Sequence, residues 1–180
     1  MKENKKGFTL IELLAVIVIL ALIMGIAITA MGDVLNKSEK NAARRTAASL
    51  IDGVRQRLTL AGRLKKGCYA FENSILEKGG INSPLGGEWK YATDAPSGFT
   101  AVNGATGIYK ASDSSSCSCS AAGTYSYVLI GGSGSRSDND YTSDEQFTYS
   151  ICLVAGSENP YIDGSESDIT KDSPDVIKGE

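Results

Sequence analysis

Histidine is absent from this chain of 180 residues, and with it the commonest general base and the commonest metal ligand. Serines are plentiful, but they lie in low-complexity runs such as Ser112 to Ser120, where no base accompanies a nucleophile. The first of only four prolines is Pro84, so nothing before it forces a helix to break. We therefore expect no enzyme and no cofactor, and we expect a long helix in the N-terminal part of the chain.

Acidic residues are scarce in residues 36–66 and basic residues are scarce from Gly67 onward, although the net charge is only −3. Residues 36–66 carry nine Lys and Arg, opposed by Glu39 and Asp52 alone. From Gly67 onward, six basic residues face sixteen acidic ones. A basic helical region therefore precedes an acidic body rich in Gly and Ser.

The N-terminus combines a short basic stretch with a long apolar one. Lys2, Lys5 and Lys6 precede residues 8–31, which are almost all apolar. At 1.5 Å per residue such a helix spans roughly 36 Å, enough to cross a bilayer core of about 30 Å. The lysines would keep the N-terminus in the cytoplasm. The alternative is a cleavable secretory signal, for which Ala27 and Ala30 imitate a cleavage site.

Glu12 is the one residue of the apolar run that hydrocarbon does not favour. A carboxylate there costs roughly 2.5–3.5 kcal/mol on insertion scales. We therefore expect Glu12 to meet a cationic partner in the working state. The simpler alternative is that its side chain reaches the nearby membrane interface.

The residues around Glu12 carry a family resemblance, over about ten positions. They resemble the class III signal sequence of type IV pilins and pseudopilins, through Lys5-Lys6-Gly7-Phe8-Thr9-Leu10-Ile11-Glu12-Leu13-Leu14. The resemblance implies that a prepilin peptidase cuts between Gly7 and Phe8 and methylates the new amino group of Phe8. It also implies that Glu12 meets the amino terminus of a neighbouring subunit during assembly.

The partners and location follow from the same resemblance. The precursor would lie in the cytoplasmic membrane and later in a filament of self copies and other pilins at the cell surface, built by an assembly ATPase and platform protein. It would be a structural subunit of a type IV pilus for adhesion, aggregation or motility. One alternative is a pseudopilin of a secretion or DNA-uptake system, and another is an anchored ectodomain that never polymerises. We do not expect DNA as the main ligand, because the basic helix would lie largely inside the filament.

The expected fold is α+β, with one long N-terminal helix and a small antiparallel sheet. Residues 1–7 would be the leader, 8–31 the transmembrane half of the helix, 32–64 its amphipathic half and 65–180 the head. Apolar residues from Val34 to Ala61 recur mostly at three- and four-residue steps, which indicates an amphipathic helix. Its apolar stripe requires a partner, and the head can supply a sheet.

The predicted strands differ in strength. Those at 124–130 and 147–154 are richest in Tyr, Val, Ile and Phe, and we expect them to pair antiparallel. A short strand is predicted at 88–92, and weaker candidates lie at 98–102 and 107–111. We predict a loop over 68–87 and a polar, acidic, partly disordered tail over 157–180.

Four cysteines, Cys68, Cys117, Cys119 and Cys152, favour disulfides in an exported domain. Joining Cys117 to Cys119 would close a very small ring, so one should pair with Cys68 and the other with Cys152. Which pairs with which stays open, and free thiols or a metal site are the alternatives.

Two acidic clusters, the first in 138–145 and the second at Asp163, Glu166 and Asp168, have the oxygen atoms that calcium prefers. The first lacks the spacing of an EF-hand. We interpret both as solvated surface and expect no metal.

Overall fold

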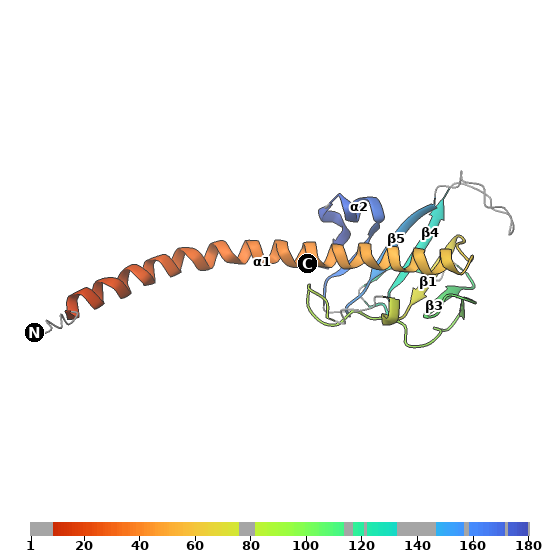
Figure 1. Ribbon diagram of the computed structural model, residues 1–180, viewed down its shortest axis with the longest axis horizontal. Helices are drawn as coiled ribbons and strands as arrows, with labels where there is room; N and C mark the ends of the chain where they lie inside the picture. Colours follow the sequence, from red (N-terminus) through yellow and green to blue (C-terminus); the bar gives the residue numbers. More distant parts are fainter. Residues whose placement is uncertain are drawn as a thin grey trace, which may run out of the picture. The chain divides into compact units, whose positions relative to one another are not determined.

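The computed structural model describes residues 9–75, 82–113, 117–120, 122–132, 147–156, 159–171 and 173–179. Two compact units divide the chain, Met1–Ser38 and Glu39–Glu180. Helix α1 (Leu10–Leu60) contributes residues to both units. Below, "the head" means the unit Glu39–Glu180, some of whose elements are labelled in Figure 1.

Helix α1 ends at Leu60 because a glycine follows it. Gly62 has a φ of 61°. The Arg63 amide donates to the Leu58 carbonyl, and the Gly62 amide donates to the Thr59 carbonyl. These two bonds form a Schellman motif, which terminates a helix at a residue in the left-handed conformation. The helix predicted from the sequence extended to about Leu64, because Gly62 was not recognised as the residue that ends it.

In the part of the head that the structure describes, seven strands form one antiparallel sheet. Their order across the sheet is β2-β3-β1-β4-β5-β6-β7. The strands are β1 (Gly67–Phe71), β2 (Phe99–Ala101), β3 (Ile108–Ala111), β4 (Tyr127–Gly132), β5 (Phe147–Leu153), β6 (Tyr161–Ser165) and β7 (Ile177–Lys178). Over the described residues, the head also contains three short helices, η1 (Asn73–Ile75), α2 (Glu166–Thr170) and η3 (Pro174–Val176). The α+β fold predicted from the sequence is confirmed.

The main core lies between the sheet and the part of α1 within the head, which runs along one face of the sheet (Figure 1). The buried face of α1 consists of small and branched apolar residues at helical spacing: Ala43, Ala47, Leu50, Ile51, Val54 and Leu58. They pack with buried residues of the central strands, among them Tyr69, Val128 and Ile151. Each fully buried large apolar side chain stabilises the head by about 1.5–3 kcal/mol.

A second, smaller core covers the opposite face of the sheet. It contains Cys68 and Ala70 from β1, Tyr127 from β4 and Cys152 from β5. Tyr125 packs against it, with its ring centroid 5.4 Å from that of Phe99 in an edge-to-face contact. Both faces of the sheet are therefore covered.

Several strand predictions hold and others are wrong. The predicted pair at 124–130 and 147–154 corresponds to β4 and β5, which are antiparallel with Val128 opposite Ile151. The predicted loop at 68–87 is wrong at its start, because residues 67–71 form β1, which pairs with β3 and β4. The predicted strand at 88–92 is wrong, because only Glu88 forms a bridge there, with Asn82.

The C-terminal prediction is also wrong. The described residues between 161 and 178 form β6, α2, η3 and β7, where a partly disordered tail was expected. Four apolar side chains, Ile162, Ile169, Val176 and Ile177, are buried in the main core. Acidic residues between them, such as Asp163 and Asp168, are exposed. The acidic composition therefore describes the surface of a folded segment.

Candidate functional site

The first turn of α1 is closed by its own side chains. The Thr9 amide donates to Glu12 Oε2 at 2.9 Å, and the Thr9 hydroxyl donates to the same oxygen at 2.9 Å. In return the Glu12 amide approaches Thr9 Oγ1 at 3.4 Å. This reciprocal arrangement is a capping box, in which the N-cap residue and the third helical residue satisfy each other's backbone amides. Glu12 therefore has local partners at the end of the helix.

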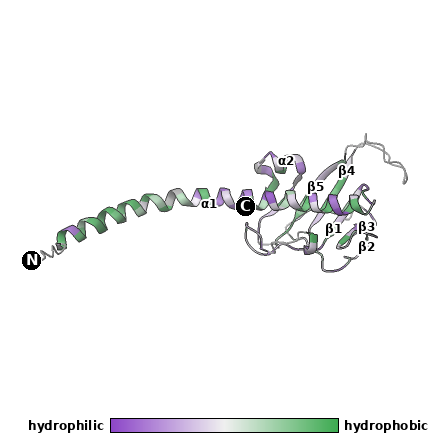
Figure 2. Cartoon of the chain, in the orientation of Figure 1, coloured by the Kyte–Doolittle hydropathy of each residue, from purple (hydrophilic) through white to green (hydrophobic). Residues whose placement is uncertain are grey.

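The helix beyond Glu12 is apolar on all sides, and its side chains are exposed over the described residues 10–28. Figure 2 shows the hydrophobic colouring along this part of α1. By length and composition, α1 is the one helix among the described residues that could cross a membrane. Exposed apolar surface on this scale marks contact with a membrane or with other proteins. Glu12 is the only charged residue between Leu10 and Gly32.

Gly7 and Phe8, the predicted cleavage and methylation site, lie outside the described residues, which begin at Thr9. The roles of Gly7, Phe8 and Glu12 stay predictions.

In the head, Arg55 ties α1 to α2 and to β5. Its Nη2 donates to both carboxylate oxygens of Glu166, at 2.6 and 2.5 Å, and its Nη1 donates to Asp52 at 3.1 Å. The guanidinium carbon lies 4.1 Å from the centroid of the Tyr149 ring. One cation is thus shared between two carboxylates, so the three charged groups together keep one negative charge.

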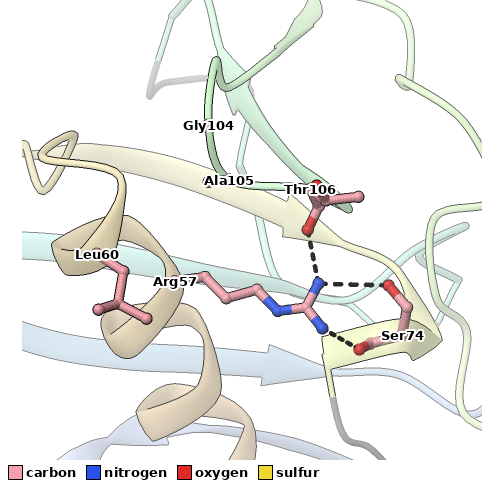
Figure 3. A pocket seen from close by; sticks show the side chains of 6 residues that line it. All are labelled: Arg57, Leu60, Ser74, Gly104, Ala105 and Thr106. Atoms are coloured by element: carbon pink, nitrogen blue, oxygen red, sulfur yellow. Dashed lines mark hydrogen bonds between the residues drawn. The ribbon is translucent and has the colours of Figure 1, made fainter.

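Arg57 crosses a hollow of about 370 Å³ beside the end of α1. Figure 3 shows its guanidinium turned toward Ser74 and Thr106, with Leu60 at the edge of the same hollow. Nη1 donates to the Thr106 carbonyl at 2.6 Å, and Nη2 donates to the Ser74 carbonyl. These bonds occupy the guanidinium, so Arg57 is better explained as a link between α1 and the loops at Ser74 and Thr106 than as an anion-binding residue.

The four cysteines form two disulfides, Cys68–Cys117 and Cys119–Cys152. Cys68 lies in β1 and Cys152 in β5, the two strands on either side of β4. Cys117 and Cys119 therefore connect the neighbours of β4 across the second core. This is the pairing that the sequence left undecided.

The acidic residues weighed for calcium have other roles where they are described. Glu166 binds Arg55. Asp168 lies in the first turn of α2, where its amide donates to the hydroxyl oxygen of the N-cap Ser165 at 3.2 Å and its carboxylate accepts from that hydroxyl at 2.5 Å. No group of three or more His, Cys, Asp or Glu that could hold a metal occurs in the described part of the chain. Residues 138–145, the other cluster, lie outside the described residues.

Buried tyrosines in the described part of the head have raised pKa values. Burial raises the pKa of Tyr69 to about 12, although its hydroxyl also donates to the Lys65 carbonyl at 2.8 Å. Burial likewise raises the pKa of Tyr127 to about 12, with a further contribution from the charge of Asp163. Both groups therefore titrate only at strongly alkaline pH.

Sequence reasoning missed the capping role of Thr9 and the contacts of Arg55 and Arg57. A signal existed for the first, because Thr followed by Glu three residues later is the capping-box pattern. No local signal existed for the arginines, whose partners Glu166 and Thr106 lie 111 and 49 residues further along the chain.

Comparison with known families finds one match. Residues 2–28 match the prokaryotic N-terminal methylation motif. No curated protein and no solved structure matches the chain. The matched motif is the prepilin signature of type IV pilins and pseudopilins, and it supports a precursor similar to a pilin or pseudopilin. Together with the apolar helix, this motif fits a membrane-anchored precursor.

Proposed function

We propose that this chain is the precursor of a structural subunit of a type IV pilus, and that it polymerises through α1. The observation that carries the proposal is the methylation motif at residues 2–28 joined to a helix whose apolar side chains are exposed over residues 10–28. The exposed surface requires a bilayer before assembly and other subunits after it. The role is structural, and adhesion, aggregation or motility would be functions of the filament.

Assembly starts from the precursor in the membrane, with the lysines of the leader in the cytoplasm. A prepilin peptidase cleaves between Gly7 and Phe8 and methylates the Phe8 amine. An ATPase and a platform protein then lift the subunit from the membrane. In the filament, Glu12 pairs with the Phe8 amine of a neighbouring subunit, and the apolar helices supply most of the cohesion through dispersion and hydrophobic contact.

Processing controls assembly in this mechanism. Before cleavage Phe8 has no free amine, so Glu12 has no intermolecular partner. Until then the bonds from Thr9 satisfy part of the carboxylate, which lowers the cost of keeping a charge near the membrane.

A pilus is favoured over a pseudopilus by the construction of the head. The seven-stranded sheet and the two disulfides of the described head would resist unfolding outside the cell, which a filament exposed at the surface requires. The pseudopilus remains the second candidate, since it uses the same assembly chemistry.

The test is to shear filaments from the producing cells and determine the N-terminus of this protein by mass spectrometry. We expect it to begin at N-methylated Phe8 in the sheared fraction. A chain that begins at Met1 or after Ala30, and is found only in membranes or medium, would contradict the proposal. A processed chain that is absent from sheared material of cells with visible pili would favour the pseudopilus.

Two variants separate the charge of Glu12 from its capping role. Glu12→Gln removes the charge but keeps a side-chain oxygen that can accept from Thr9. Thr9→Ala removes the two bonds of the Thr9 hydroxyl but keeps the charge of Glu12 and its bond from the residue 9 amide. We expect normal cleavage in both and a loss of filaments in Glu12→Gln alone. Normal filament yield from Glu12→Gln would contradict the pairing role.

A further inference from the structure

The solvent-facing side of α1 within the head has an unusual charge arrangement. Between Asn41 and Leu60, α1 carries five charged residues. Three of them are engaged with the head: Arg44 donates to the Ser173 carbonyl, and Arg55 and Arg57 make the contacts described above. The other two, Arg45 and Asp52, are exposed.

Arg45 has no partner of its own on the helix. The positions three and four residues away, where an intrahelical ion pair would form, hold Asn41, Ala42, Ala48 and Ser49. Over the described residues, Arg45 makes no hydrogen bond or ion pair.

Asp52 has the opposite character. Its one partner, Arg55, already binds Glu166 with two short bonds, so this group of three keeps a net negative charge. The Asp52 side chain is 66% exposed. An exposed cation and an exposed, under-neutralised anion thus lie on the same side of α1.

The spacing of these two residues fixes how copies could meet. They are seven residues apart, which is close to two helical turns and about 10.5 Å along the axis. Ala42, Ser49 and Gln56 recur at the same interval on the exposed side. The small side chains of Ala42 and Ser49 would allow another helix to approach closely.

We propose that this strip (Ala42, Arg45, Ser49, Asp52 and Gln56) is an interface with a second copy of the chain, in which Arg45 of one copy pairs with Asp52 of the next. The inference rests on the proposed function, because subunits that enter one membrane with their N-termini on the same side have parallel helices. Parallel helices satisfy the pair only when displaced by about seven residues.

Such a contact is open-ended. Each copy uses Arg45 toward one neighbour and Asp52 toward another, so the contact repeats without closing, as in a filament. The Phe8 amine also precedes its proposed partner Glu12 in the chain, just as Arg45 precedes Asp52. Both pairs therefore favour displacement in the same direction.

Cysteine cross-linking in the producing cells tests the displacement. In the full chain, the double variant Ala42→Cys/Ser49→Cys should give a ladder of covalent multimers in sheared filaments, because residue 42 of one copy then faces residue 49 of the next. Neither single variant should give the ladder. A dimer from Ser49→Cys alone would indicate antiparallel pairing and overturn the proposal, as would filaments in which the double variant does not cross-link.

Charge exchange tests the ion pair itself. We expect Arg45→Asp and Asp52→Arg to lower filament yield about tenfold or more, because like charges then face each other. The exchange variant Arg45→Asp/Asp52→Arg should recover most of the yield. Mobility on non-reducing gels checks that the disulfides, and hence the head, have formed in every variant. Single variants with normal yield, or an exchange that recovers nothing, would overturn the proposal.

Failure of this inference differs from failure of the proposed function. If the unmodified chain begins at methylated Phe8 in sheared filaments but the charge and cross-linking results are negative, only the interface is wrong. If the unmodified chain never enters filaments, the proposed function is wrong as well.

Discussion

Removal of the disulfides should destabilise the head, and the lengths of the segments that they close set the magnitude. Cys68–Cys117 and Cys119–Cys152 close segments with sequence separations of 49 and 33. In the chain-entropy model these restrict the unfolded state by about 4.1 and about 3.7 kcal/mol at 25 °C. The two segments do not overlap, so the effects should add to about 8 kcal/mol, against a typical total stability of 5–15 kcal/mol.

The perturbation is paired replacement, Cys68→Ala/Cys117→Ala and Cys119→Ala/Cys152→Ala. Alanine is preferred to serine because Cys68 and Cys152 are fully buried, where an unpaired hydroxyl would add its own cost. Each pair should lower the free energy of unfolding by about 4 kcal/mol. Reduction of the unmodified chain with a phosphine is the matched control, because it removes the covalent links and leaves the side chains nearly unchanged.

The assay is denaturant unfolding of the full chain in detergent, followed by fluorescence. Trp89 is the only tryptophan and is 3% exposed within the main core, so its emission reports on the head. A loss of less than about 1 kcal/mol for either pair would refute the entropic reasoning. A loss seen in the alanine variants but not after reduction would assign the effect to packing.

Three further predictions concern the head. Gly53→Ala should destabilise the head by about 1–3 kcal/mol, because the added Cβ would lie 2.6 Å from Ile75 Cγ2. Gly25→Ala is the control, because a Cβ there would have no atom within 4 Å. If denaturant unfolding showed a more stable head in Gly53→Ala, the predicted steric contact would be contradicted. Glu166→Gln should cost about 1–2 kcal/mol, and the loss should shrink in high salt; an unchanged unfolding midpoint would show that the pair with Arg55 adds nothing. The pKa of Tyr69 is raised to about 12 from an unfolded value near 10. Its contribution to the stability of the head is therefore complete below about pH 10 and is lost as the pH rises toward 12. Unfolding curves that give equal stability at about pH 9 and about pH 11 would contradict this prediction.

Sequence patterns predicted the parts of the fold that have strong periodicity. The apolar stripe of α1 repeats at helical spacing, and β4 and β5 are rich in branched and aromatic residues, so both were recognised. Strand β1 was missed because Gly67–Phe71 is buried at every position. A short strand covered on both faces has no alternation, and periodicity cannot distinguish it from an apolar loop.

The C-terminal segment was missed for a different reason. Average composition hides a few apolar residues at the right positions. Ile162, Ile169 and Val176 reach the main core, while Asp163 and Asp168 between them are exposed. Gly164 permits this packing, because a Cβ there would lie 2.6 Å from Val176 Cγ1. Such long-range fit leaves no local pattern in the sequence.

For the candidate site, the motif around Glu12 was legible because its chemistry is local. The Arg55 and Arg57 contacts were not legible, since they depend on which distant residues the fold brings to the helix.

The charge pairs proposed here would select a register more than they would hold subunits together. An exposed ion pair contributes about 0–1 kcal/mol, far less than the apolar surface of α1 can supply. That surface is nearly uniform in Leu, Ile and Val, so apolar contact alone would tolerate many displacements. Breaking a desolvated pair would not be tolerated, because it leaves a charge uncompensated.

A variant that sets the two pairs in conflict tests this division of roles. Asn41→Arg/Arg45→Asn moves the cation one turn earlier, so that pairing with Asp52 requires a displacement of eleven residues instead of seven. The Phe8–Glu12 pair requires a displacement of about four residues. A displacement of seven differs from that register by three residues, whereas a displacement of eleven differs from it by seven. We therefore expect normal processing, intact disulfides and a loss of filaments of the same order as in Arg45→Asp. Filaments at normal yield would show that apolar contact sets the register and that the charges are incidental.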